Sequence, residues 1–310
     1  MQIARSTVES ALQVRSEVSA MRLIKLRTQV PVPEVFGFKA DDDNPVGAAF
    51  ILMEYIPGNV ATDADGGYPS HHGRIPLTRQ EIFFRSVQIA SIRFPKIGTI
   101  TWSRDSGFDI GPFPIIGGPF ETATSFFRAW AAHAFFPMPV DEIKKILEKG
   151  PVDDVLRSIQ SFPERIEAKA HQLSSFDSGP FPVAHPDFFH SNIVINREYE
   201  VLSVIDWEGT CTLPWELMEF PPFLETVPVP MDAPWNYDEN GEPNDEETKQ
   251  KWMERRNYLH MVQQFEAAES LDDRLSSMLA TERVQNLAYA LRVYKHPGKL
   301  GFYDKVLEQF

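Results

Sequence analysis

The segment formed by residues 185–208 constrains this chain more than any other stretch of its sequence. It reads HPDFFHSNIVIN, then REYE, then VLSVIDWE, which predicts two short strands around a polar turn at residues 197–200. In the antiparallel pairing that this turn implies, Asn192 faces Ile205, the neighbour of Asp206. Since paired strands lie about 5 Å apart, we expect the hairpin to bring an amide oxygen and a carboxylate to the same end of its ladder.

Asp187 lies in the loop that leads into this hairpin, five residues before Asn192. Two carboxylates and an amide oxygen that converge form a set of hard oxygen ligands, which Mg²⁺ prefers when phosphate oxygens and waters complete its coordination. Asp and Asn are also common in ordinary turns. The combination of Asp187, Asn192 and Asp206, with His185 ahead of them, favours a functional site over three unrelated turn residues.

The same segment resembles the catalytic loop of kinases, H-x-D-x-x-x-x-N, and the metal-binding Asp that follows it. In the form H-P-D-x-x-H-x-N with I-D-W-E, it is most similar to the aminoglycoside phosphotransferase family, within the wider protein-kinase-like fold. Residues 16–18 (SEV) resemble the helix that carries the family's regulatory Glu, and residues 50–58 (FILMEYIPG) resemble its hinge strand. The resemblance covers about residues 15–295, with Pro186 in place of a common Gly.

The resemblance implies an α+β chain with a two-lobe, protein-kinase-like fold, a reduced N-terminal sheet and a mainly helical C-lobe. We expect residues 1–57 to form a truncated N-lobe with a helix, strands and the hinge. Residues 58–310 then form a helical C-lobe with the catalytic loop and the metal-binding hairpin. The hydrophobic patterns and turn residues predict helices over 1–28, 79–93, 120–173 (broken at 150–151 and at 163) and from about 248 to 294, a loop over 59–76, and strands over 35–38, 48–56 and 98–102.

The resemblance assigns roles to the residues of the catalytic segment. Asp187 would accept or orient the proton of a substrate hydroxyl, and His185 would brace the loop. Asn192 and Asp206 would hold Mg²⁺. The reaction implied is transfer of phosphate from ATP, with Mg²⁺, to a hydroxyl group of a small molecule.

The resemblance also implies a nucleotide site in the first part of the chain. The hinge residues Glu54, Tyr55 and Ile56 would bind adenine, with backbone groups of Glu54 and Ile56 forming the hydrogen bonds. Glu17 would pair with a Lys that holds the nucleotide phosphates. No such Lys is found, because Lys25 falls within the helix pattern and Lys39 follows a pair of prolines.

The family's Gly-rich phosphate loop is also missing ahead of the hinge. We consider three explanations for these absences. The chain is a truncated gene model or splice form of an active kinase, a real pseudoenzyme, or an enzyme in which another group takes the place of the Lys. The first is favoured, because Asp187, Asn192 and Asp206 are all intact. The function classes that remain open are therefore a small-molecule kinase, a catalytically impaired pseudokinase that acts as a binding protein, and a metal-dependent hydrolase with the same oxygen ligands.

Composition excludes several other classes. The 30 basic and 44 acidic side chains leave a net charge of −14, which argues against a nucleic-acid partner. Cys211 is the single cysteine, so an intrachain disulfide framework is excluded. The longest uncharged apolar run, Val46–Met53, is too short to span a membrane, and no membrane partner is expected. The oligomeric state is left open.

The expected location is the cytosol. The first residues lack the basic and then apolar pattern of a secretory signal. Several Arg and Lys side chains fall within the first 30 residues, as in a mitochondrial presequence, but Glu9 and Glu17 argue against one.

The acceptor itself is expected to be a small molecule with a hydroxyl group. The stretch of residues 231–254 is rich in Asp and Glu, and one interpretation is that it attracts a cationic amine substrate. The other is a solvated loop that keeps the protein soluble.

Overall fold

The computed structural model describes residues 8–66, 78–148, 150–295 and 299–310. Its α-helices are α1 (Val8–Arg27), α3 (Thr78–Ser91), α4 (Ala123–His133), α5 (Val140–Ile146), α6 (Val152–Lys169), α7 (Glu246–Ala268), α8 (Arg274–Ala280), α9 (Glu282–Val293) and α10 (Tyr303–Val306). Its strands are β1 (Val35–Lys39), β2 (Phe50–Met53), β3 (Asn59–Val60), β4 (Arg93–Phe94), β5 (Gly98–Ser103), β6 (Gly107–Gly111), β7 (Phe181–Ala184), β8 (Ile193–Ile195), β9 (Val201–Val204) and β10 (Cys211–Thr212).

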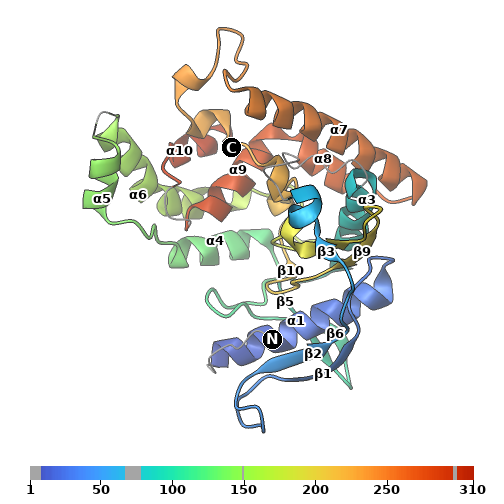
Figure 1. The fold of residues 1–310 in the computed structure, drawn as a ribbon. Coiled ribbons are helices and arrows are strands. Elements are labelled where there is room, and N and C mark those ends of the chain that lie inside the picture. Colours follow the sequence, from blue (N-terminus) through green and yellow to red (C-terminus); the bar gives the residue numbers. More distant parts are fainter. Residues whose placement is uncertain (1–7, 67–77, 149, 296–298) are drawn as a thin grey trace.

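The chain combines a small N-terminal unit with a larger, mainly helical body. Figure 1 shows α1, β1 and β2 together at one end of the molecule, with α7, α8 and α9 at the other. The predicted α+β class is confirmed. In the part of the chain that the structure describes, no helix is both long enough and apolar enough to cross a membrane.

The N-terminal sheet has two strands, β1 and β2, which pair antiparallel with Lys39 opposite Phe50. The strand predicted over 48–56 is therefore shorter than expected, because β1 offers a partner of only five residues. Helix α1 packs on both strands and also on β5 of the body. Its buried face includes Met21 and Ile24, whereas Leu26 is 69% exposed. Two positions along a helix turn the side chain by about 200°, so Leu26 points away from the face of Ile24.

A five-stranded sheet in the order β4-β7-β10-β5-β6 forms the centre of the body. Sequence patterns predicted β5 in part but missed β4 and β10, since strands of two residues carry no periodicity. A separate three-stranded sheet, β3-β8-β9, holds the predicted hairpin. The predicted loop over 59–76 begins with β3 and a 3-10 turn, Ala61–Gly66, and residues 67–77 lie outside the described residues.

The predicted helix break at Pro163 is wrong, because α6 continues through this residue. A proline inside a helix leaves the carbonyl four residues earlier without its backbone donor. That carbonyl belongs to Ile159, and it accepts a hydrogen bond of 2.9 Å from the hydroxyl of Tyr294, the residue that follows α9. A tertiary contact therefore replaces the missing backbone bond.

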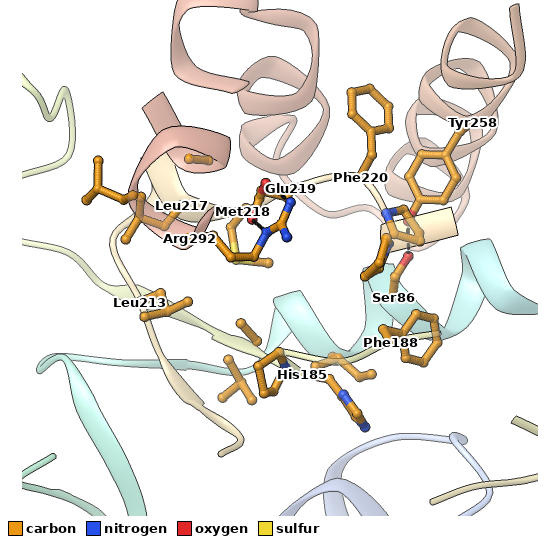
Figure 2. Close-up of a pocket in the computed structure, with 18 of the residues that line it drawn as sticks. Ser86, His185, Phe188, Leu213, Leu217, Met218, Glu219, Phe220, Tyr258 and Arg292 are labelled. Carbon is orange, nitrogen blue, oxygen red and sulfur yellow. Dashed lines mark hydrogen bonds and ion pairs between the residues drawn. The ribbon is translucent and has the colours of Figure 1, made fainter. Parts of the chain in front are cut away.

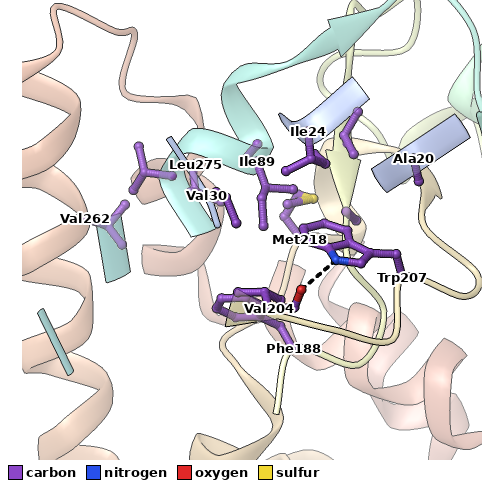
Figure 3. Close-up of a cluster of buried hydrophobic side chains, with 14 of the residues drawn as sticks. Ala20, Ile24, Val30, Ile89, Phe188, Val204, Trp207, Met218, Val262 and Leu275 are labelled. Atoms are coloured by element: carbon purple, nitrogen blue, oxygen red, sulfur yellow. Dashed lines mark hydrogen bonds between the residues drawn. The ribbon is translucent and has the colours of Figure 1, made fainter. Parts of the chain in front are cut away.

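One buried cluster joins α1 to the catalytic segment. Figure 3 shows Ala20 and Ile24 of α1 in the same cluster as Trp207 and Phe188. Trp207 is fully buried, and its indole N–H donates to the carbonyl of Val204 at 2.9 Å. The helix that carries Glu17 is thus fixed against the body by a continuous core that spans the predicted lobe boundary at residue 57. The division at that boundary stays a prediction.

Candidate functional site

The loop between β7 and β8 holds the first two candidate residues in direct contact. Strand β7 is buried along its whole length, and the exposed Asp187 follows it by three residues. The side-chain amide of the buried Asn192 donates to the Asp187 carboxylate at 2.9 Å and to its backbone carbonyl at 2.8 Å. These two bonds fix the Asp187 side chain and leave the amide oxygen of Asn192 as the acceptor that can face a cation.

The hairpin delivers Asp206 to the end of the ladder where Asn192 lies. The pairs Ile193–Val204 and Val194–Ser203 follow the predicted register. The backbone N–H of Ile205 donates to the Asn192 carbonyl at 2.9 Å, as that register requires. Toward the turn the register slips by one residue at a bulge, so that Ile195 pairs with Val201. The slip lies at the far end and leaves the Asn192 end as predicted.

Asp206 leaves the strand in an unusual backbone conformation. Its φ is +60°, in the left-handed region that residues other than Gly rarely adopt, although Asp and Asn tolerate it best. Such strain costs about 1–3 kcal/mol and clusters at functional sites. The turn exposes the Asp206 carboxylate while Trp207, the next residue, enters the core.

His185 connects the loop to the hairpin. Its Nδ1 accepts from the backbone N–H of Asp187 at 3.2 Å, so Nε2 carries the proton and donates to the Ile205 carbonyl at 3.4 Å. Its ring lies 4.8 Å from that of Trp207, centroid to centroid. Burial lowers the pKa of His185 to about 4, so the ring is neutral at pH 7. A neutral imidazole with a hydrogen bond at each ring nitrogen can hold the loop in place. It cannot act as a general acid at that pH.

Helix α1 places Glu17 near the end of the hairpin that carries Asp206 and Glu208. Burial, together with the negative charges of Glu208 and Asp206, raises the pKa of Glu17 to about 7. No basic side chain of the described residues lowers it. Burial and Asp206 also raise the pKa of Glu208, which accepts a hydrogen bond from the amide of Gln13 on α1.

These contacts extend the candidate site beyond the residues that the motif supplied. Gln13 was not among the predicted site residues. Its position one helical turn before Glu17 could have indicated it, because residues four apart lie on the same face of a helix. The lysines ahead of the hinge do not reach Glu17. Lys25 forms an ion pair of 2.6 Å with Glu34, and Lys39 lies at the exposed end of β1.

The hinge residues lie at the opposite end of β8. Strand β3, which follows the hinge, pairs Asn59 with Ile195. The backbone N–H of Glu54 donates to the Glu34 carbonyl at 2.8 Å. Within the described chain, the Glu54 carbonyl and the Ile56 N–H have no hydrogen-bond partner, and Tyr55 is 84% exposed. The structure thus brings Glu17, Asp187, Asn192 and Asp206 to one end of β8. Glu54, Tyr55 and Ile56 precede Asn59, which pairs with Ile195 at the other end of that strand.

The described residues contain no group of three or more His, Cys, Asp or Glu arranged to hold a metal ion by themselves. Asn192 and Asp206 supply an amide oxygen and a carboxylate, which fits Mg²⁺, because this ion keeps several waters and binds through one or two protein ligands plus phosphates.

The body also contains two hollows near the site. A cavity of about 280 Å³ is lined by residues of β7, the catalytic loop and several helices, and Figure 2 shows His185 and Phe188 on one side of it and Arg292 on the other. A second, of about 470 Å³, lies between α1 and the β5–β6 hairpin and reaches Gly209, just after Glu208.

No protein-family model matches the chain. Among curated proteins, it is 25% identical to the altered inheritance of mitochondria protein 9, mitochondrial, of Eremothecium gossypii, over 74% of this chain and 45% of that protein. It is 21% identical to the protein of the same name from Kluyveromyces lactis, over 91% of this chain and 55% of that protein. A subtelomeric hrmA-associated cluster protein of Aspergillus fumigatus is 32% identical over 29% of this chain and 17% of its own length. The chain spans about half the length of the first two relatives.

Two solved structures resemble the chain over most of its length. One is a putative aminoglycoside phosphotransferase from Ralstonia eutropha, with 14% identity, a TM-score of 0.45, and coverage of 97% of this chain and 80% of that one. The other is a putative fructosamine-3-kinase from Haemophilus somnus, with 15% identity, a TM-score of 0.44, and coverage of 98% and 81%.

The comparison with curated proteins contradicts the predicted cytosolic location, because these relatives are named as mitochondrial proteins. The prediction depended in part on Glu17 as an acidic residue in a potential presequence. Glu17 belongs to α1, which packs into the folded protein, so its charge carries no information about targeting.

Proposed function

We propose that this chain carries the catalytic part of a phosphotransferase, which moves a phosphate group from ATP to a hydroxyl of a small molecule with the help of Mg²⁺. The observation that carries the proposal is the contact network of the catalytic loop. Asn192 holds the Asp187 carboxylate with its amide and receives the N–H of Ile205 on its carbonyl. A proton acceptor and two cation ligands are thereby gathered at one end of a hairpin.

In this proposal Asp187 takes the proton of the attacking hydroxyl, since its carboxylate is exposed and held in place. Asn192 and Asp206 would hold Mg²⁺, which would supply positive charge to offset the negative charge of the phosphate groups in the transition state. His185 keeps the loop against Ile205 and takes no part in proton transfer, because it is neutral and both its nitrogens are engaged.

The hinge supports the nucleotide part of the proposal. The Glu54 carbonyl and the Ile56 N–H offer an acceptor and a donor two residues apart, which suits the edge of a purine. Asn59, which follows the hinge, pairs with Ile195, and Ile195 is separated from Asn192 by three strand residues, or about 10 Å. A nucleoside triphosphate bound at the hinge would therefore extend along β8 toward Asn192 and Asp206.

A pseudokinase is the second candidate, and the surroundings of Glu17 favour it. Its carboxylate faces Asp206 and Glu208 with no basic partner in the described chain. Since phosphoryl transfer depends on positioning and electrostatics, uncompensated negative charge beside the phosphates would weaken nucleotide binding. On this alternative the protein binds a metabolite or another protein without turnover.

Thermal shift and phosphate transfer separate the two candidates. A kinase shows a rise in melting temperature with Mg·ATP and transfers labelled phosphate to a hydroxyl acceptor. The Asp187→Ala variant is expected to lower kcat by about 10²–10⁴-fold without unfolding, and Glu198→Gln, an exposed change in the hairpin turn, serves as its control. No shift at millimolar Mg·ATP favours the pseudokinase. Phosphate release without any acceptor points to hydrolysis instead.

The proposed location is the mitochondrion, on the basis of the named relatives. Tagged full-length protein that co-fractionates with a matrix or membrane marker of mitochondria supports this location. Recovery in the soluble cytosolic fraction alone contradicts it.

A further inference from the structure

A cavity of about 280 Å³ lies beside the catalytic loop, near the lower end of the range of about 300–1,000 Å³ that is common for ligand sites. Its wall comes from β7, the loop after β7, and helices α3, α4, α7 and α9. Most of the lining side chains are apolar, among them Ile89, Phe126, Trp130, Phe188 and Leu291. The cavity therefore favours a small ligand with an apolar body.

The cavity is close to the proposed base. His185, Pro186 and Phe188, the neighbours of Asp187 in the chain, all line it. Pro186 is exposed, whereas Phe188 is buried. A ligand whose apolar part lies against Phe188 can thus extend past Pro186, so that its other end approaches the Asp187 carboxylate.

The charges on the cavity wall balance each other. Glu219 and Arg292 both line it and form an ion pair of 2.8 Å, and Arg292 also binds Glu225 at 2.8 Å. On the opposite wall the hydroxyls of Ser86 and Tyr258 lie 2.6 Å apart in a hydrogen bond (Figure 2). The wall thus offers no excess carboxylate to a cationic ligand.

The acidic stretch of residues 231–254 does not supply the negative charge that the cavity wall lacks. Asp238 accepts the backbone N–H groups of Asn240 and Glu242, and Asp245 caps the start of α7 through Thr248. Glu246 and Glu247 pair with lysines on their own helix. None of these acids lines the cavity, so the structure supports the interpretation of a solvated loop.

We propose, on the basis of the proposed phosphotransferase function, that the acceptor is a small, uncharged and largely apolar alcohol. Its apolar body fills the cavity between Phe188, Trp130 and Leu291, and its hydroxyl faces Asp187. Polycationic amines and polyols are excluded as preferred acceptors, because the first lack counter-charges and the second would leave hydroxyls without partners against an apolar wall.

The test begins with binding in the absence of ATP and Mg²⁺. The chain is titrated with benzyl alcohol and cyclohexylmethanol, and with benzylamine and glycerol as comparisons. We expect saturable binding and a higher melting temperature for the two alcohols only. Trp130 provides a local signal: 4-bromobenzyl alcohol quenches tryptophan fluorescence in the native chain, and the Trp130→Phe variant loses that part of the quenching.

A variant that fills the cavity makes the test specific. Ala288 of α9 is 2% exposed and lines the cavity, so Ala288→Leu is expected to weaken alcohol binding at least tenfold. Ala267→Leu on the exposed face of α7 is the matched control and leaves binding unchanged. Equal binding of benzylamine, no saturable binding of either alcohol, or quenching that survives both Trp130→Phe and Ala288→Leu overturns the proposal.

Addition of Mg·ATP separates this inference from the function on which it depends. We expect phosphate transfer to the bound alcohol, with Ala288→Leu raising KM more than it lowers kcat. Transfer to glycerol but to neither apolar alcohol overturns the acceptor assignment and leaves the phosphotransferase intact. Alcohol binding with no transfer to any acceptor overturns the phosphotransferase, and with it the assignment of the alcohol as an acceptor.

Discussion

Glu17 on α1 and His185 on the catalytic loop lie on the two sides of the candidate site, and burial acts on them in opposite directions. Both are driven toward their neutral forms, so the pKa of the acid rises to about 7 and that of the imidazole falls to about 4. His185 is compensated by two hydrogen bonds, whereas Glu17 meets further negative charge. Within the described chain, the buried imidazole on the loop side has its hydrogen-bond partners, whereas the carboxyl group on the helix side has no basic partner.

The two residues also couple stability to pH with opposite signs. The unfolded chain releases the Glu17 proton near pH 4.5 and the folded chain near 7, so this contribution is present below pH 4.5 and lost as the pH rises to 7. For His185 the unfolded chain takes up a proton near 6.5 and the folded chain near 4, so its contribution is present above 6.5 and lost as the pH falls to 4. In the native chain the two effects largely cancel between pH 4.5 and 6.5.

The largest expected effect comes from Asp206→Asn, which separates catalysis from stability. Asn also tolerates the positive φ at this position, so the fold should persist. Loss of the proposed Mg²⁺ ligand is expected to lower kcat/KM with Mg·ATP by at least about 100-fold. Without divalent cations the melting temperature at pH 8 should rise, because the charge beside Glu17 is removed. A fall in both quantities would contradict the interpretation of Asp206 as an exposed ligand.

Glu17→Gln should remove one of the two opposing contributions, so that the stability of the variant follows the pH dependence of His185 alone. The variant is expected to be more stable than the native chain by about 2 kcal/mol at pH 8 and equally stable at pH 4.5, where the native Glu17 is protonated. Denaturant unfolding in EDTA measures this. Glu164→Gln, an exposed change on α6, is the control. Equal gains at both pH values would mean that the charge of Glu17 is not the cause.

His185→Phe should change the stability in the opposite direction, with a loss at high pH in place of a gain. Loss of both hydrogen bonds is expected to destabilise the chain by about 1–2 kcal/mol at pH 8. At pH 4.5 the deficit should vanish or reverse, since the native chain there bears the cost of keeping His185 neutral. Unfolding curves at the two pH values provide the measurement, and a deficit that grows on acidification would refute a neutral, buried brace.

Tyr294→Phe is the smallest change and lies away from the charged site. It removes the hydroxyl that bonds the Ile159 carbonyl beside Pro163, at an expected cost of about 1 kcal/mol. Burial raises the pKa of Tyr294 to about 12, so the cost should be constant from pH 5 to 9. Unfolding across that range tests this. A pH-dependent cost would show that the linkage assigned to Glu17 and His185 is not confined to their site.

Much of the geometry of residues 185–208 could be predicted from the sequence, because it depends on local patterns. A short turn and alternating apolar residues fix the hairpin, and the hairpin fixes that Asn192 faces Ile205. The roles of Asp187, Asn192 and Asp206 stay predictions, as do those of the hinge residues. The same local reasoning failed at Pro163, where the hydroxyl of a residue distant in sequence decided the outcome.

By itself, the sequence determined which polar side chains stand at the ends of one hairpin, since strand pairing alternates side chains with a period of two. Only the tertiary structure decided what surrounds them. Burial and the approach of α1 set the charge environment of Glu17, and helices distant in sequence close the apolar cavity beside Asp187. The charge environment and the cavity depend on desolvation and on contacts between segments that are distant in sequence. Neither of these can be inferred from a local pattern of residues.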